Sequence, residues 1–199
     1  MKTRAPDFDV PVPDSQFRNV QGFWVDENWA WILTRPASQL QAIPINIQTG
    51  RRDLSAAVNL DSLGNPNGLT FADGRWFHPI SFPNAFGDGR TLTRLYSSGG
   101  FYDLPTHPGI PVTPRGCGTV GDYVVISAYV FNFSTRVATF ELFFFDTTTN
   151  LFETTRPWSL SPTNSSGVDV TGDDGVLWVY DQTDNKMYAY NADTGVALT

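Results

Sequence analysis

The sequence predicts an all-β protein built from four copies of one small antiparallel sheet. Its 17 glycines and 14 prolines separate short runs rich in β-branched and aromatic residues, which is typical of strands and turns. No segment keeps a helical period of 3.6 residues for long. One order of strand, tight turn, strand, loop, strand and turn recurs four times, with closing turns near residues 50, 100, 150 and 195. The repeat is therefore about 45 to 50 residues long.

The first copy opens at Gly22 and closes at Thr49 and Gly50. The ten or so residues after this turn can supply an outer strand. Residues 53–63 have two interpretations, because their leucines, alanine and valine could share one face of a short helix but also fit a strand. The three clearest strands of this copy are expected at residues 22–25, 29–32 and 42–47.

The other three copies repeat this order. In each, a strand opens at a glycine, a tight turn rich in Asp and Gly follows, and two more strands come before the closing turn. The strands are expected at residues 68–71, 75–77 and 91–96 in the second copy, 118–120, 123–126 and 140–145 in the third, and 167–170, 176–180 and 186–190 in the fourth.

Units of this length with four strands resemble the blades of a β-propeller, in which small sheets are arranged radially. The fourth copy, with its turns at 172–175 and 191–195, looks like the blades of the broad NHL, YncE and lactonase-like group. The resemblance covers residues 19–199 and implies a four-bladed propeller domain there, preceded by an extended segment at residues 1–18. It implies an architecture and no particular activity.

The extended N-terminal segment has two interpretations. The fourth copy keeps only residues 196–199 after its closing turn, so residues 5–12 could pair there as an outer strand and close the ring. Pro6 and Pro11 fit an outermost strand, where one flank needs no hydrogen bonds. The alternative is a disordered tail. Because four blades are the usual minimum, the chain either closes its own ring or forms part of a ring that a partner completes.

The charge balance argues against a nucleic-acid partner. Lys and Arg number 13 against 20 for Asp and Glu, and the formal net charge of -7 repels phosphate and anionic lipid. No apolar run reaches the roughly 20 residues of a membrane-spanning helix, and residues 1–13 show no signal-peptide pattern. The single cysteine, Cys117, excludes an intrachain disulfide. We expect a soluble, acidic protein of the cytoplasm or of a virion.

Few motifs carry chemistry. Gly116, Gly118 and Gly121 form a G-x-G-x-x-G string, but the residues after it read as a strand, whereas a dinucleotide site needs a helix. A blade-opening turn explains these glycines better. The two imidazoles, His78 and His107, each precede a proline and have no nucleophile elbow beside them, so we expect packed or solvated side chains. We predict no cofactor and no structural zinc.

A polar mouth is the candidate binding site. In a propeller, the connections that enter the first strands and those that join second to third strands gather on one face. An Asn precedes the opening Gly in three copies, although Asn is also a common turn residue that bonds to its own backbone. A central divalent cation with oxygen ligands is a second use of this face. The mouth residues are Asn19, Arg35, Asn67, Asn84, Asn132, Arg136, Asn164, Asp181 and Asp184.

Two other features have structural explanations. The pair Asp173 and Asp174 invites an acid/base interpretation, but the equivalent residues Asp26, Asp73 and Asp122 all fall in the turn between first and second strands. In residues 143–145, three consecutive Phe rings point alternately to the two faces of a strand. The third blade is then buried between its neighbours, or a partner covers one side of it.

Two functions from different classes fit this sequence. The first is a non-catalytic propeller that binds proteins as a rigid platform, as a subunit of a larger assembly such as a phage or virion particle. The scarcity of lysine, with only Lys2 and Lys186, and the abundance of Thr, Asn, Pro, Gly and Phe favour it. The alternative is a lactonase-like metal-dependent hydrolase or a carbohydrate-binding propeller.

Overall fold

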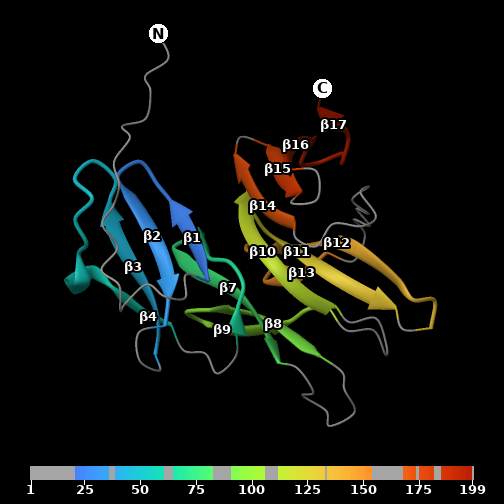
Figure 1. The fold of residues 1–199 in the computed structure, drawn as a ribbon, viewed down its shortest axis with the longest axis horizontal. Coiled ribbons are helices and arrows are strands. Elements are labelled where there is room, and N and C mark those ends of the chain that lie inside the picture. The colour runs from blue at the N-terminus through green and yellow to red at the C-terminus, as the bar shows by residue number, and fades with distance from the viewer. Residues whose placement is uncertain are drawn as a thin grey trace. The chain divides into compact units, whose positions relative to one another are not determined.

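The computed structural model has the all-β, four-bladed β-propeller fold that the sequence predicts (Figure 1). Four antiparallel sheets follow one another along the chain, and consecutive strands pair within each sheet, except that β5 and β6 both pair with β7. The chain divides into two compact units, Met1–Ser62 with the first sheet and Leu63–Thr199 with the other three. The structure describes residues 21–35, 39–60, 65–82, 91–105, 112–132, 134–153, 168–173, 175–181 and 185–198.

Blade 1 forms the described part of the first unit. Its strands are β1 (Gly22–Val25), β2 (Trp29–Thr34), β3 (Leu40–Asn46) and β4 (Val58–Leu60). A three-residue 3₁₀ turn, η1 (Leu54–Ala56), lies between β3 and β4. Residues 1–18, and with them the predicted ring-closing strand, lie outside the described residues.

The short turn η1 and the strand after it decide between the two interpretations for residues 53–60, the described part of the segment 53–63. The Asp53 carboxylate accepts hydrogen bonds from the N–H groups of Ser55 at 3.0 Å and Ala56 at 3.3 Å. Such a cap starts a helix, but η1 ends after three residues and the chain continues into β4. The strand interpretation is therefore right for Val58–Leu60, and the helix interpretation holds only for the single 3₁₀ turn Leu54–Ala56.

Blade 2 begins the second unit and has a divided first strand. Both β5 (Asn65–Pro66) and β6 (Thr70–Ala72) pair with the same strand, β7 (Arg75–Phe82). The strands β8 (Leu92–Ser97) and β9 (Gly100–Asp103) complete the sheet. The innermost strand of this blade is thus made of two short pieces.

Blades 3 and 4 complete the second unit. Blade 4 ends in a two-residue outer strand, as the few residues after its closing turn predict. The strands of blade 3 are β10 (Val112–Val120), β11 (Tyr123–Asn132), β12 (Val137–Asp146) and β13 (Leu151–Phe152), and those of blade 4 are β14 (Val168–Asp173), β15 (Val176–Asp181), β16 (Lys186–Asn191) and β17 (Ala197–Leu198).

The first strand of blade 3 is longer than the sequence predicts. The string that begins at Gly116 lies inside β10 and in the turn after it, so its assignment to a blade-opening turn was wrong. Pro114 is accepted in β10 because this strand pairs on one side only, with β11, and a bulge between Pro114 and Gly116 absorbs the irregularity. A strand follows the string, as expected, which agrees with the rejection of a dinucleotide site.

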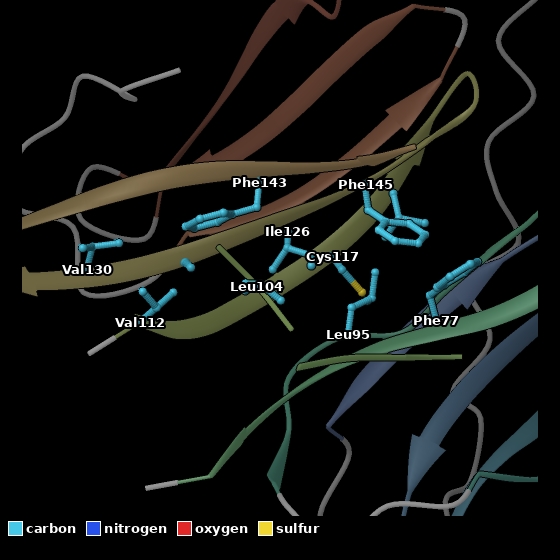
Figure 2. Close-up of a cluster of buried hydrophobic side chains, with 11 residues drawn as sticks. Phe77, Leu95, Leu104, Val112, Cys117, Ile126, Val130, Phe143 and Phe145 are labelled. Atoms are coloured by element: carbon cyan, nitrogen blue, oxygen red, sulfur yellow. The ribbon is translucent and has the colours of Figure 1, made fainter. Parts of the chain in front are cut away.

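A first hydrophobic core joins blades 2 and 3. Phe77 and Leu95 of blade 2 pack with Ile126 and Phe145 of blade 3 (Figure 2). The rings of Phe77 and Phe145 are 5.8 Å apart, centroid to centroid. Burial of such large side chains between two sheets is the main source of stability in a propeller.

A second core joins blades 3 and 4 and contains Phe144 and Leu177. Phe143, Phe144 and Phe145 expose only 9, 1 and 0% of their surface. Phe143 and Phe145 belong to the first core and Phe144 to the second, because neighbouring side chains of a strand point to opposite faces. The prediction that neighbouring blades cover both faces of blade 3 is confirmed.

The first strands of blades 3 and 4 approach each other backbone to backbone. A Cβ atom on Gly118 of β10 would come within 2.6 Å of the Cα atom of Thr171 in β14. A Cβ atom on Gly172 of β14 would likewise collide with the carbonyl oxygen of Thr119. Only glycine permits this approach. The two blades are therefore held together by close backbone packing as well as by a hydrophobic core.

Within the part of the chain that the structure describes, no helix is long and apolar enough to cross a membrane.

Candidate functional site

A polar cleft lies between blades 2 and 3, at the end of the sheets where their tight turns gather. It has a volume of about 660 Å³. Its walls come from the β6–β7 turn, the β10–β11 turn and the turn that follows β12. We call it the turn cleft, and the residues that line it are Phe71, Ala72, Asp73, Arg75, Thr119, Gly121, Asp122, Thr147, Thr148 and Asn150.

Equivalent side-chain caps shape the turn after the third strand of every blade. In each blade the first residue of this turn accepts a hydrogen bond from the backbone N–H two residues ahead, over distances of 2.7 to 3.2 Å. Such caps are the usual role of Asn, Asp and Ser in turns. The four capping residues are Asn46, Ser97, Asp146 and Asn191.

The cap in blade 3 carries a charge that its turn stabilises. Burial alone would raise the pKa of Asp146, but hydrogen bonds from Thr148 and Thr149 outweigh this effect and hold the pKa below its ordinary value. The N–H groups of these two residues lie 2.7 and 3.2 Å from Oδ1 of Asp146. The turn that forms one wall of the cleft is thus fixed by an ionised carboxylate.

Blade 3 ends its turn with a different residue from blades 1 and 4. Gly50 and Gly195 close the turns of those blades with φ angles of 66° and 70°, and Asn150 takes the same left-handed position with φ 58°. In all three, the closing N–H bonds to the carbonyl oxygen of the capping residue at 2.8 to 2.9 Å. Asn tolerates this conformation better than most side chains do. With Asn150 in place of glycine, blade 3 contributes a side-chain amide group to the lining of the cleft.

Arg75 lines the turn cleft and bonds to both of its blades. Its Nη1 donates to Oδ1 of Asn150 at 2.8 Å, and its Nη2 donates to the carbonyl oxygen of Thr147 at 2.9 Å and to Oδ2 of Asp73 at 3.1 Å. The guanidinium also lies over the ring of Phe77, 5.2 Å from its centroid. Its buried Nε has no hydrogen-bond partner. The side chain is therefore held in one position by contacts from both blades.

The side chain of Asn150 is the meeting point of these contacts. Its Oδ1 accepts from Arg75 and also from the hydroxyl of Tyr102 at 3.1 Å, and both donors belong to blade 2. We call this group the Arg75–Asn150 junction. Hydrogen bonds to a charged donor are among the stronger polar contacts in proteins. The junction thus links the two blades by hydrogen bonds at the cleft.

Two carboxylates stand at the rim of the cleft, one on each blade. Asp73 lies in the β6–β7 turn with φ 46° and keeps 64% of its side chain exposed. Asp122 lies in the β10–β11 turn, and its carbonyl oxygen accepts from the N–H of Thr147 at 2.9 Å. Asp26 caps the corresponding turn of blade 1. The prediction that these three acidic residues belong to turns is confirmed.

The predicted polar mouth is only partly described. Asn132 ends β11 and Arg136 precedes β12, at the opposite end of these strands from the turn cleft. Oδ1 of Asn132 accepts from the N–H groups of Ser134 at 2.9 Å and Thr135 at 3.2 Å, which is the turn role considered for Asn. The shared mouth stays a prediction. Arg35, Asn67 and Asp181 also fall in the described part of the chain, whereas Asn19, Asn84, Asn164 and Asp184 lie outside it.

His78 is the packed histidine that the sequence predicts. Its side chain is 2% exposed, its ring stacks on Tyr96 at 5.7 Å, and neither ring nitrogen has a hydrogen-bond partner. Burial lowers the pKa of His78 to about 4, so the imidazole is neutral at pH 7. His107 lies outside the described residues. Among the residues that the structure describes, no three His, Cys, Asp or Glu side chains gather as a metal site requires.

Comparisons with known proteins show no family for this chain. No protein-family model matches it, and no curated protein sequence does. Among solved structures, a nidogen/laminin complex is 11% identical with a TM-score of 0.44, and the match covers 90% of this chain and 78% of that one. An ACO/RPE65 chimera is 7% identical with a TM-score of 0.49, covering 85% and 45%. A structure from a study of two prolyl endopeptidases is 11% identical with a TM-score of 0.40, covering 89% and 27%.

The chain therefore spans less than half the length of the last two structures. The fold assignment rests on the chain's own four sheets, and the site has to be interpreted from its own residues.

Sequence reasoning missed the residues that form the junction, Arg75, Tyr102 and Asn150. One signal for Asn150 was present, because the closing turns of the first and fourth copies have Gly where the third has Asn. Nothing in the sequence indicates which side chains this amide meets, because its partners lie 75 and 48 residues away.

Proposed function

We propose that the protein is a non-catalytic β-propeller that binds other proteins as a rigid platform. The observation that carries this proposal is the face of blade 4 turned away from blade 3, where Trp178, Met187 and Leu198 expose 39, 53 and 45% of their surface. Strand register puts these three side chains on one face of the sheet. We call it the Trp178 face.

The opposite face of blade 4 is the one that packs on blade 3, which leaves the Trp178 face free of that core. Leu177 and Val179 point the other way and are buried in the core shared with blade 3. Large apolar side chains that gather on a surface mark sites of protein association, and Trp is among the residues that contribute most to such interfaces. The packed sheets behind this face give it a fixed shape, which lowers the entropic cost of binding.

We further propose that the chain works as a subunit of a larger assembly, such as a phage or virion particle. The low lysine content and the abundance of Thr, Asn, Pro, Gly and Phe support this. In this proposal residues 19–199 form a propeller of the NHL, YncE and lactonase-like group, a partner completes its ring at the Trp178 face, and the polar mouth is a second contact region.

Site-specific photo-crosslinking in the cells that make the protein tests the platform function. Trp178 is replaced by p-benzoylphenylalanine, and the exposed turn residue Thr49 is replaced in a matched control. We expect a covalent adduct of one discrete mass at position 178 and none at position 49. Adducts of the same pattern at both positions, or none at position 178, would overturn the proposal.

A further inference from the structure

The charged groups of the turn cleft leave one negative charge uncompensated. Its lining contains one positive side chain, Arg75, and two negative ones, Asp73 and Asp122. Both terminal nitrogens of Arg75 already bond within the protein, to Asp73, Thr147 and Asn150. Among the described residues, no hydrogen bond or ion pair engages the Asp122 carboxylate. The cleft therefore suits a cationic ligand and offers an anion little.

The two carboxylates line the same cleft from two different blades. Asp73 stands on blade 2 and Asp122 on blade 3, and the Arg75–Asn150 junction ties these two blades together at the same cleft. Each carboxylate lies in a two-residue turn between directly paired strand residues, Ala72 with Arg75 and Val120 with Tyr123. Carboxylates that are held in place in this way bind a cation without a further loss of conformational freedom.

Other lining groups fit the stem of a basic side chain. Phe71 contributes an aromatic ring at the wall, and Thr148 contributes a hydroxyl. An aromatic ring next to carboxylates attracts both the charge and the methylene groups of Lys or Arg. The volume of about 660 Å³ exceeds what one side chain needs, which leaves room for the main chain that carries it. A metal ion fits less well, because the cleft supplies two carboxylates and no third ligand of this kind among the described residues.

We infer that the turn cleft between blades 2 and 3 receives a lysine or arginine side chain of the partner protein. The inference rests on the proposed function, since it identifies a further contact of the same platform, separate from the Trp178 face and the polar mouth. The net charge of -7 favours a basic partner surface and speeds its approach.

A titration followed by NMR tests the cleft with a defined probe. The full chain, labelled with ¹⁵N, is titrated with N-acetyl-arginine methylamide, which has the charged side chain but no charged termini. The matched probe is N-acetyl-citrulline methylamide, which has nearly the same shape and no charge. We expect the arginine probe to shift the amide signals of Gly121, Asp122 and Thr148, and the citrulline probe to shift them much less.

Two variants show whether the Asp122 carboxylate is responsible. Asp122→Asn keeps the backbone carbonyl that Thr147 uses and removes the charge, and we expect about fivefold weaker binding of the arginine probe, the effect of one lost surface charge pair. Asp193→Asn removes one exposed charge from a turn of blade 4 and is expected to leave binding unchanged. Preserved amide spectra establish that both variants fold.

The outcomes separate this inference from the platform function. Three results would each overturn the cleft assignment. The first is equal amide shifts with both probes, and the second is amide shifts at Asp193 as large as those at Asp122. The third is unchanged binding of the arginine probe by Asp122→Asn. The photo-crosslinking at position 178 does not depend on the cleft. A specific adduct there together with a silent cleft would leave the platform proposal standing and remove only this inference.

Discussion

Asn150 shows how one residue of a repeat can take on a new task. It holds the left-handed turn position that glycine holds in blades 1 and 4, and its side chain also joins blade 3 to Arg75 and Tyr102 of blade 2. The turn itself could be predicted from the sequence, because Asn and Gly both favour this conformation. The partners of Asn150 could not be predicted, because they depend on how two sheets face each other.

Asn150→Gly is expected to lower the free energy of unfolding by about 1 to 2 kcal/mol. Glycine adopts the left-handed conformation with less strain than Asn, which stabilises the variant slightly. However, Nη1 of Arg75 and the Tyr102 hydroxyl lose their acceptor. The loss of a hydrogen bond to a charged group destabilises the fold by more than the reduced strain stabilises it. Urea unfolding measures the difference. The control is Gly195→Asn, the reverse exchange at the matching turn, which we expect to cost about 1 kcal/mol or less. A variant as stable as the parent would contradict the role of the junction.

His78 makes the stability depend on pH. Its pKa is about 4 in the folded protein against an ordinary value of 6.5, so between these values the unfolded chain binds the proton more readily. The stability that depends on a neutral His78 imidazole is fully present above pH 6.5, and it is lost as the pH falls towards 4. Over this range of 2.5 pH units the loss approaches about 3 kcal/mol.

His78→Leu is expected to flatten this part of the pH profile. Urea unfolding of parent and variant between pH 5 and 7.5 gives the comparison, because this range lies above the ordinary pKa of the carboxylates. The free energy of the parent should fall with decreasing pH more steeply than that of the variant. Two parallel curves would show that the imidazole takes up its proton equally well in the folded and unfolded states.

At the scale of elements, the second and third strands of blade 4 were predicted to within one residue, whereas β14 runs three residues past its predicted end and β10 of blade 3 starts six residues before its predicted start. Along β15 the buried residues Leu177 and Val179 flank the exposed Trp178, and turns that contain Gly175 and Gly195 bound β15 and β16. Pro114 and Gly116 interrupt β10 and look like the end of a strand. Because β10 is the innermost strand and pairs on one side only, it accepts Pro114 and Gly116 without losing a ladder of hydrogen bonds on its other side.

Gly118→Ala tests the close approach of β10 to β14. The new methyl group would lie 2.6 Å from the Cα atom of Thr171, so the backbone of blade 4 must shift, and we expect a loss of about 3 kcal/mol in the free energy of unfolding. Gly99→Ala is the matched control, because its nearest neighbour would be the Ser97 hydroxyl at 3.8 Å. We expect that control to stay within about 0.5 kcal/mol of the parent. A Gly118→Ala variant as stable as Gly99→Ala would refute the backbone contact.

At the scale of the whole molecule, the repeat length and the strand order were sufficient to predict the four-bladed propeller. They could not identify the turn cleft. Its charged groups come from turns that the sequence explains fully as turns, and only the packing of blade 2 on blade 3 brings them together. The same holds for the Trp178 face, because strand alternation predicts two faces of a sheet but does not tell which one is covered.

A rigid platform requires that blades 2, 3 and 4 unfold as one cooperative unit. Native-state hydrogen exchange measures the free energy of unfolding of each blade separately and so tests this requirement directly. The amides of the middle strands β7, β11 and β15 report on one blade each. The shared cores and the contact at Gly118 predict one common free energy of exchange for the slowest amides of all three strands. If β15 exchanged through a separate opening of much lower free energy, blade 4 would move independently of blade 3, and the description of these blades as one rigid body would be wrong.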